Sequence, residues 1–131
     1  PVTLLGSGAI LTEVLQAAEQ LAAQGINAHV VSVTSWSELA RDGQACEGHA
    51  DGAATPWLAQ VLAHTQGPIV AATDYVRAVP ETVRAYLPPG RAYRTLGTDG
   101  FGRSDTRAAL RRAFGVDAKN IAATAHALLR G

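Results

Sequence analysis

Four short segments with the composition of strands recur along the chain, separated by longer segments with helical periodicity. They lie at residues 2–5, 28–33, 68–73 and 91–96. The second is rich in β-branched residues and lacks a clean alternation of apolar and polar positions. Strands covered on both faces show this pattern, as in parallel sheets with helices on either side. The four segments therefore predict a parallel sheet.

The intervening segments carry apolar residues three and four positions apart, which places one apolar stripe along a helix face. In the first of them, Ser7 can cap the helix, and Gly25 fits the left-handed conformation that ends many helices. Asp117 is expected to cap the last helix of the chain. Further helical segments are expected near Trp36–Ala40, Pro56–Leu62 and Pro80–Tyr86, and over residues 106–114.

One stretch interrupts the alternation of strands and helices. Residues 42–55 are rich in glycine and alanine and show no periodicity. They have few large apolar side chains whose burial could offset the entropy cost of ordering. We therefore expect a flexible loop here, and the first site of cleavage in limited proteolysis.

Alternating strands and helices imply right-handed crossovers and a sheet packed between two helix layers. The expected fold class is therefore α/β, with three layers (α/β/α) and a mainly parallel sheet of four strands. The chain has 131 residues, which fits a single domain over residues 1–131. It contains no methionine, so we expect a fragment of a longer enzyme.

Composition and charge exclude several classes of function. Apolar residues make up 47% of the chain, charged residues make up 17%, and the formal net charge is zero. This balance argues against a disordered tail and gives no overall field that would attract nucleic acid. There is no apolar run of the ~18 residues that a membrane span needs. We therefore expect neither nucleic acid nor membrane as a partner, and the single Cys46 favours a cytoplasmic location.

Polar and aromatic side chains follow the ends of the predicted strands. Because the carboxyl ends of parallel strands meet at one edge, where ligand crevices form, we expect these side chains to contact a partner or line a channel. They are Ser7, Gly8, Ser35, Trp36, Glu38, Arg41, Asp42, Asp74, Tyr75, Asp99, Gly100, Phe101, Gly102, Arg103, Ser104 and Asp105. No residue of the chain is assigned a catalytic, cofactor-binding or metal-binding role.

The glycine-bearing turn at residues 6–8 opens a helix, where exposed N–H groups can meet a phosphate. The dinucleotide-binding fingerprint would need a third glycine where Leu11 stands. A tight turn with a serine cap is therefore favoured over an anion site. No histidine pair has the spacing of a zinc-binding helix, and His29 is expected to be a hydrogen-bonded core residue.

Four stretches carry a family resemblance: residues 4–8, 33–44, 72–75 and 96–105. The last contains an Asp-x-Phe-Gly-x-Ser loop. Together they resemble the C-terminal domain of the homodimeric type of pyruvate dehydrogenase, the thiamine-dependent decarboxylating component, and more distantly the transketolases. The resemblance runs nearly the whole length of the chain. It implies four parallel strands, and an antiparallel edge strand that would precede them and is expected to be missing here.

The resemblance also implies a function. The full enzyme uses thiamine diphosphate and magnesium to decarboxylate pyruvate oxidatively and to acetylate a lipoyl group. Its magnesium motif, Gly-Asp-Gly, is absent here. The chain alone is therefore expected to be inactive, to bind no cofactor, and to complete the dimer and support the channel to the cofactor. The implied partners are the N-terminal and middle domains of the same enzyme, a homodimer partner and a lipoyl acyltransferase.

Two alternatives stay open at this point. One is a regulatory module that binds an anion or small molecule through the helix start at Gly8 and through Arg103. The other is the same domain of a transketolase or of another 2-oxo acid dehydrogenase. Within the resemblance, residues 35–44 favour the pyruvate type over transketolase.

Overall fold

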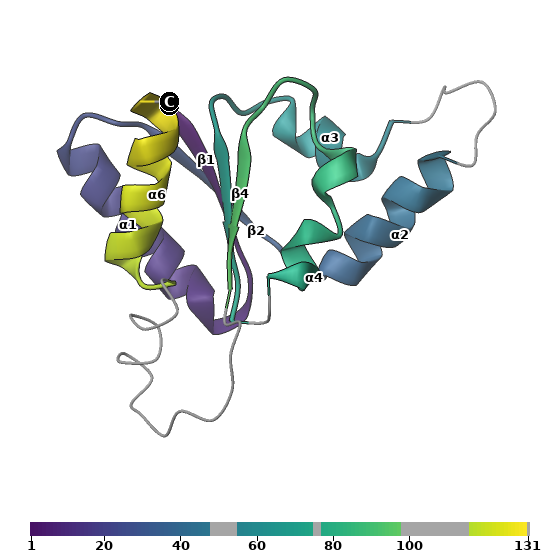
Figure 1. Ribbon diagram of the computed structural model, residues 1–131, viewed down its shortest axis with the longest axis horizontal. Helices are drawn as coiled ribbons and strands as arrows, with labels where there is room; N and C mark the ends of the chain where they lie inside the picture. The colour runs from purple at the N-terminus through teal and green to yellow at the C-terminus, as the bar shows by residue number, and fades with distance from the viewer. Residues whose placement is uncertain (48–54, 75–76, 98–115, 131) are drawn as a thin grey trace.

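A computed structural model describes residues 1–47, 55–74, 77–97 and 116–130. Its centre is a four-stranded sheet in the order β2-β1-β3-β4, in which all neighbouring strands are parallel (Figure 1). The strands are β1 (Val2–Gly6), β2 (Ala28–Ser32), β3 (Ile69–Ala72) and β4 (Tyr93–Leu96). All four predicted strands are confirmed.

Helices cover both faces of the sheet, which confirms the three-layer α/β/α prediction (Figure 1). One face carries the short 3-10 helix η1 (Gly8–Ile10), α1 (Leu11–Ala23) and α6 (Ala118–Arg130). The other face carries α2 (Trp36–Glu47), α3 (Trp57–Leu62), α4 (Ala78–Glu81) and the 3-10 helix η2 (Arg84–Tyr86). In the described part of the chain, no helix has the length and apolar character needed to cross a membrane.

The core has one half on each face of the sheet. Successive residues of a strand point to opposite faces, so Leu4 packs into the half beneath α1 and α6, and Leu5 packs into the half beneath α2 and α3. Both leucines are fully buried. The central strands β1 and β3 are buried on both faces, but the strand for which cover on both faces was predicted, residues 28–33, is the edge strand β2. The edge strand β2 is only half covered, and the expectation of a core histidine is wrong, because His29 is exposed.

The ends of α1 and α6 form as the sequence predicts. Gly25 has a φ of +78°, and its N–H donates to the carbonyl of Ala22 at 3.0 Å. The next N–H, of Ile26, donates to the carbonyl of Leu21 at 2.9 Å. At the start of α6, Asp117 Oδ1 accepts the N–H of Asn120 at 3.3 Å. These bonds satisfy backbone groups that have no partner inside the helices.

The prediction of a flexible loop over residues 42–55 is wrong for its first part, because α2 continues to Glu47. Residues 48–54 lie outside the described residues. Within α2, Gly43 is buried, and a Cβ atom at this position would overlap the ring of Tyr86. A glycine in a helix costs about 1 kcal/mol relative to alanine. Here it allows a ring from another element to pack against the backbone, a contact that periodicity does not reveal.

The predicted helix over residues 80–86 is divided into α4 and η2. Val83 lies between them with φ −102° and ψ 2°, outside the helical region, and its side chain is fully buried. The helix predicted over residues 106–114 lies outside the described residues.

Candidate functional site

The carboxyl ends of three strands are joined by a buried hydrogen-bonded triad, Ser7, Trp36 and Thr73. The Trp36 indole N–H donates to Ser7 Oγ at 3.0 Å, and Ser7 Oγ donates to Thr73 Oγ1 at 3.0 Å. Each residue follows a different strand: β1, β2 and β3. Leaving such a buried polar group without its partner costs about 1–3 kcal/mol. The triad therefore fixes the three strand ends relative to one another.

This use of Ser7 differs from the predicted one. Ser7 occupies the N-cap position of η1, but its hydroxyl makes no capping hydrogen bond. The hydroxyl bonds instead to residues 29 and 66 positions away in the chain. The prediction that its side chain caps the helix is wrong, because the Ser7 hydroxyl bonds to Trp36 and Thr73 instead.

Gly8 and Asp74 meet beside the triad. Gly8 has a φ of +60°, and a Cβ atom there would lie 3.2 Å from Asp74 Oδ1. The carboxylate thus lies against the turn that begins the helical segment, where backbone dipoles favour negative charge. An external phosphate at this turn would meet the negative charge of Asp74. This arrangement does not favour the alternative of an anion-binding module at the Gly8 helix start.

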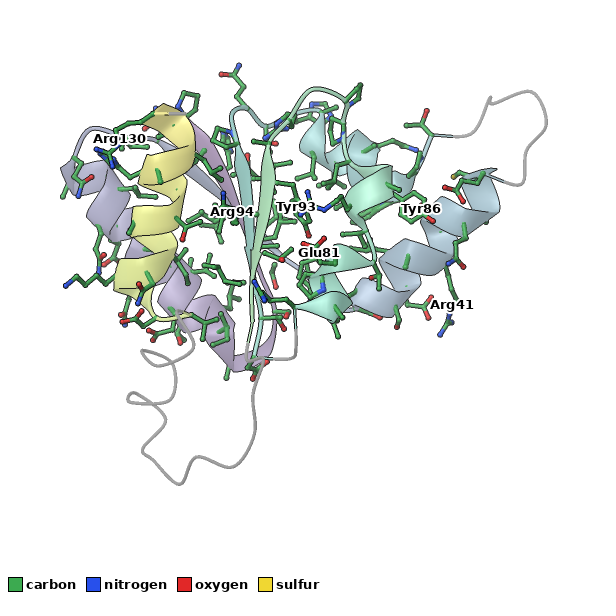
Figure 2. All side chains as sticks on the ribbon, viewed as in Figure 1. Arg41, Glu81, Tyr86, Tyr93, Arg94 and Arg130 are labelled. Carbon is green, nitrogen blue, oxygen red and sulfur yellow. The ribbon has the colours of Figure 1, made fainter. Side chains whose placement is uncertain are left out.

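The predicted residues of α2 lie further from the triad. Ser35 Oγ accepts the N–H of Glu38 at 3.2 Å and so caps the helix. Glu38 forms an ion pair with Arg41 at 2.6 Å, and both side chains are about two-thirds exposed. Arg41 points outward from α2 (Figure 2). Exposed pairs of this kind contribute at most about 1 kcal/mol.

Asp42 has a structural contact. Its Oδ2 accepts the backbone N–H of Trp57 at 2.6 Å, so it satisfies a free donor at the start of α3. The neighbouring thiol of Cys46 has its pKa raised by desolvation and by the Asp42 carboxylate. This shift disfavours the thiolate that a cysteine nucleophile needs.

The structure thus brings four predicted residues together, Ser7, Gly8, Trp36 and Asp74. Together with Thr73 they are called the carboxyl edge below. Thr73 was missed by the sequence analysis, since it is one of several threonines and only the fold places it beside Ser7. The remaining predicted residues lie outside the described part of the chain: Tyr75, Asp99, Gly100, Phe101, Gly102, Arg103, Ser104 and Asp105.

The described residues of the carboxyl edge do not supply a magnesium–diphosphate site. Magnesium prefers several oxygen ligands in near-octahedral geometry. Across the described residues, no group of three or more histidine, cysteine, aspartate or glutamate side chains could hold a metal ion. At the carboxyl edge as described, Asp74 is the one carboxylate, and it lies against Gly8. What this edge offers chemically is a rigid polar surface.

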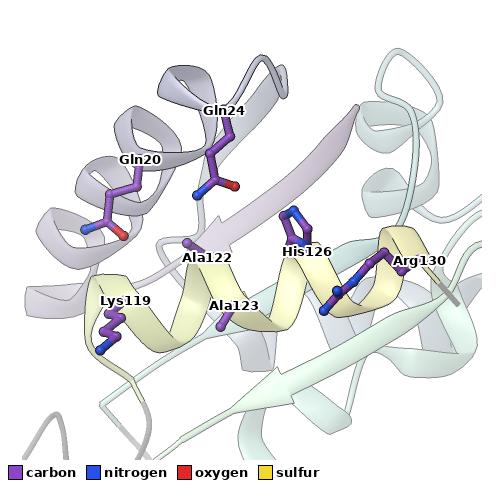
Figure 3. Close-up of a pocket in the computed structure, with 7 residues that line it drawn as sticks. All are labelled: Gln20, Gln24, Lys119, Ala122, Ala123, His126 and Arg130. Carbon is purple, nitrogen blue, oxygen red and sulfur yellow. The ribbon is translucent and has the colours of Figure 1, made fainter.

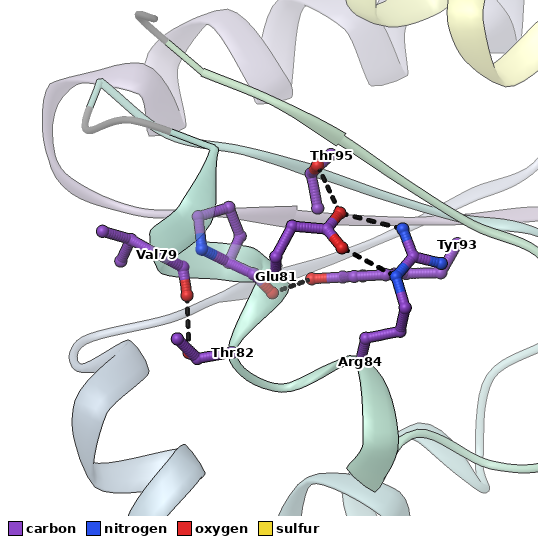
Figure 4. Close-up of polar contacts among 7 residues, drawn as sticks. Val79, Glu81, Thr82, Arg84, Tyr93 and Thr95 are labelled. Atoms are coloured by element: carbon purple, nitrogen blue, oxygen red, sulfur yellow. Dashed lines mark hydrogen bonds and ion pairs between the residues drawn. The ribbon is translucent and has the colours of Figure 1, made fainter.

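A second polar cluster, between α4 and β4, was not predicted (Figure 4). Glu81 accepts two hydrogen bonds from Arg84, at 2.7 and 2.8 Å, and one from the Thr95 hydroxyl at 2.6 Å. The bonds from Arg84 lower the pKa of Glu81, with partial burial opposing them. The Tyr93 hydroxyl donates to the carbonyl of Pro80 at 2.7 Å, and burial raises the pKa of Tyr93.

A third cluster, around Arg91, lies at the amino ends of the strands. Its guanidinium donates to the carbonyl of Gly67 at 2.6 Å, to that of Leu62 at 3.0 Å and to Thr3 Oγ1 at 3.0 Å. Partial burial lowers the pKa of Arg91. These partners lie 24 to 88 positions away in the chain, so no local pattern could have indicated them. The hydrogen bonds of Arg91 hold the segment before β4 against the segment before β3 and against β1. The cluster contains no group that could react.

The chain is similar in sequence to proteins of known family. The family model described as "Transketolase-like TK C-terminal domain" matches residues 1–117. The "Pyruvate dehydrogenase E1 component" of Escherichia coli K12 is 49% identical over 130 residues, which is 95% of this chain and 14% of that protein. The protein of the same name from Mycobacterium tuberculosis is 47% identical over 123 residues, 89% of this chain and 13% of that protein. The chain thus spans about one seventh of these relatives.

Solved structures show the same fold. One described as "Split gene transketolase, inactive beta4 tetramer" has a TM-score of 0.70 and 24% identity, and the match covers 98% of this chain and 39% of that one. A transketolase from Campylobacter jejuni has a TM-score of 0.63 and 18% identity, and the match covers 96% of this chain and 16% of that one. At these identities the likeness concerns the fold alone. The family model, which matches most of the chain, goes further: this chain belongs to the family of transketolase-like C-terminal domains.

Proposed function

We propose that this chain is the C-terminal domain of a pyruvate dehydrogenase E1 component, the enzyme that decarboxylates pyruvate oxidatively and passes the acetyl group to a lipoyl group. The observation that carries the proposal is the 49% identity to the Escherichia coli enzyme over 130 residues. The solved transketolases share the fold at much lower identity, 24% and 18%. The pyruvate enzyme is therefore favoured over a transketolase.

Within that enzyme, the proposed role of residues 1–131 is that of one domain that completes a homodimer and supports the channel to the cofactor. The carboxyl edge is the proposed contact surface for the N-terminal and middle domains. Its buried triad supports this role, because a surface held rigid before contact loses less entropy when it binds. Residues 99–105 and Tyr75 belong to the same proposed surface, with Phe101 as an aromatic anchor.

Thiamine diphosphate and magnesium are assigned to the other domains, since the described residues here do not fit them. When bound there, thiamine diphosphate would supply the carbanion stabilisation that decarboxylation of a 2-oxo acid needs. The proposal includes a lipoyl acyltransferase as the acceptor of the acetyl group. It also includes a cytoplasmic location, which the single cysteine of the chain supports.

An assay of the full-length protein tests the proposal. The purified protein is incubated with thiamine diphosphate and magnesium, and turnover is measured with pyruvate and, separately, with a ketose phosphate. We expect pyruvate-dependent release of carbon dioxide that is lost when thiamine diphosphate is left out. Turnover of the ketose phosphate without turnover of pyruvate would identify a transketolase and overturn the proposal.

A further inference from the structure

A groove of about 350 Å³ lies between α1 and α6, on the helix layer that covers one face of the sheet (Figure 3). Gln20 of α1 and Gln24, which directly follows the end of α1, line it from one side. The lining from α6 is Lys119, Ala122, Ala123, His126 and Arg130. The two alanines keep the space between the helices open, because their side chains are small.

The electrostatics of the groove differ from those of the whole chain. The chain has equal numbers of acidic and basic residues, 11 of each. The groove lining contains a lysine, an arginine and a histidine and no carboxylate. The groove therefore carries two formal positive charges on a chain whose net charge is zero.

The polar side chains of the groove also lack protein partners. Among the described residues, none of the five polar side chains that line it makes a hydrogen bond or an ion pair with another protein group. Elsewhere in the described part, Arg41 and Arg84 each pair with a carboxylate three residues away. The groove thus presents cationic and amide donors that are available to a ligand.

We propose that this groove binds an acidic peptide segment of a partner protein. Lys119 and Arg130 are eleven positions apart on α6, a distance of about 16 Å at 1.5 Å per residue. A compact anion such as phosphate cannot reach both ends. An extended peptide advances ~3.3 Å per residue, so about five residues span the groove and bring a carboxylate to each end. The glutamines between them can donate to peptide carbonyls.

The inference is independent of the proposed function. The groove lies on the outer side of α1 and α6, and the residues of the carboxyl edge are not part of its lining. A failure of the pyruvate assay leaves the groove unaffected, and a failure of peptide binding leaves the proposed enzyme unaffected.

Fluorescence anisotropy with a labelled hexaglutamate peptide tests the inference on the full-length protein at low ionic strength. We expect saturable binding in the micromolar range that weakens as salt is added, because the contacts are charged. The double variant Lys119→Gln, Arg130→Gln should lose affinity at least tenfold. Both side chains are exposed, so the variant should fold, and circular dichroism checks that it does.

The matched control is Arg94→Gln, which removes one exposed positive charge outside the groove. Its affinity should stay within about threefold of the original. Three results would overturn the inference: no binding of hexaglutamate below 1 mM, an equal loss in the control variant, or displacement of the peptide by equimolar inorganic phosphate. The last would identify a site for small anions.

Discussion

At the scale of single residues, the fold depends on positions whose role appears only when distant parts of the chain meet. Gly43 lies in the middle of a helix, where the sequence offers no reason for a glycine, and the ring of Tyr86 packs against it. Ser7 stands where a helix cap is expected, and its hydroxyl joins Trp36 to Thr73 instead. In both cases a tertiary contact overrides a local preference.

Replacement of Gly43 by alanine tests the first of these contacts. In an open helix, Gly43→Ala would stabilise by up to about 1 kcal/mol. Here the new methyl group would overlap the Tyr86 ring, so we expect a loss of about 1–3 kcal/mol in urea unfolding. When the Tyr86 ring has already been removed by Tyr86→Ala, adding Gly43→Ala should destabilise the protein less than it does in the original chain. A stabilising effect of Gly43→Ala in the original chain would contradict the packing described.

Replacement of Ser7 by alanine tests the triad. The change removes the buried acceptor of the Trp36 indole N–H and the buried hydroxyl that donates to Thr73 Oγ1. We expect the free energy of unfolding to fall by about 1–3 kcal/mol. The control is Ser37→Ala, an exposed serine on α2, which should change stability by less than about 0.5 kcal/mol. Equal effects of the two changes would show that the triad does not hold the strand ends.

For whole helices and strands, the spacing of apolar residues predicts those elements whose pattern repeats along the segment. The four strands and the stripes of α1 and α6 follow from apolar spacing, and Gly25 and Asp117 mark helix ends as predicted. The length of α2 and the break at Val83 do not follow from spacing, and neither does the packing of Gly43 against the Tyr86 ring, which joins α2 to η2. For the candidate site, the parallel strand order predicts that the carboxyl ends of the strands meet. It does not predict the hydrogen bonds among the side chains at those ends.

The cluster at α4 and β4 predicts how stability depends on pH. The pKa of Glu81 is lowered in the folded protein, so folding favours its ionised form. The resulting stabilisation is fully present above the unfolded pKa, for which 4.5 is the ordinary value, and is lost as pH falls through the folded pKa. Glu81→Gln removes this titration. Its stability, measured by urea unfolding, should therefore fall less steeply below pH 4.5 than that of the original chain, and an unchanged slope would exclude the effect.

At the scale of the whole molecule, polar function is separated from the apolar core. The sheet is buried between helix layers, and the carboxyl edge gathers the ends of β1, β2 and β3 into one rigid polar surface. The α1–α6 groove lies on the outer side of one layer. We propose that the first of these surfaces contacts the rest of the enzyme and that the second binds a separate acidic partner.

We propose that the carboxyl edge contacts the rest of a pyruvate dehydrogenase. Amide hydrogen exchange tests it most directly, measured on the full-length protein and on the 131-residue chain under the same conditions. We expect the amides of Gly8–Ile10 and of residues 34–37 to exchange at least tenfold more slowly in the full-length protein. A contact at the carboxyl edge would suppress the local opening that exchange requires. The amides of the exposed residues Ala22, Ala23 and Gln24, at the end of α1, serve as the internal reference and should exchange alike in both. Equal exchange at the carboxyl edge in the two proteins would contradict the account.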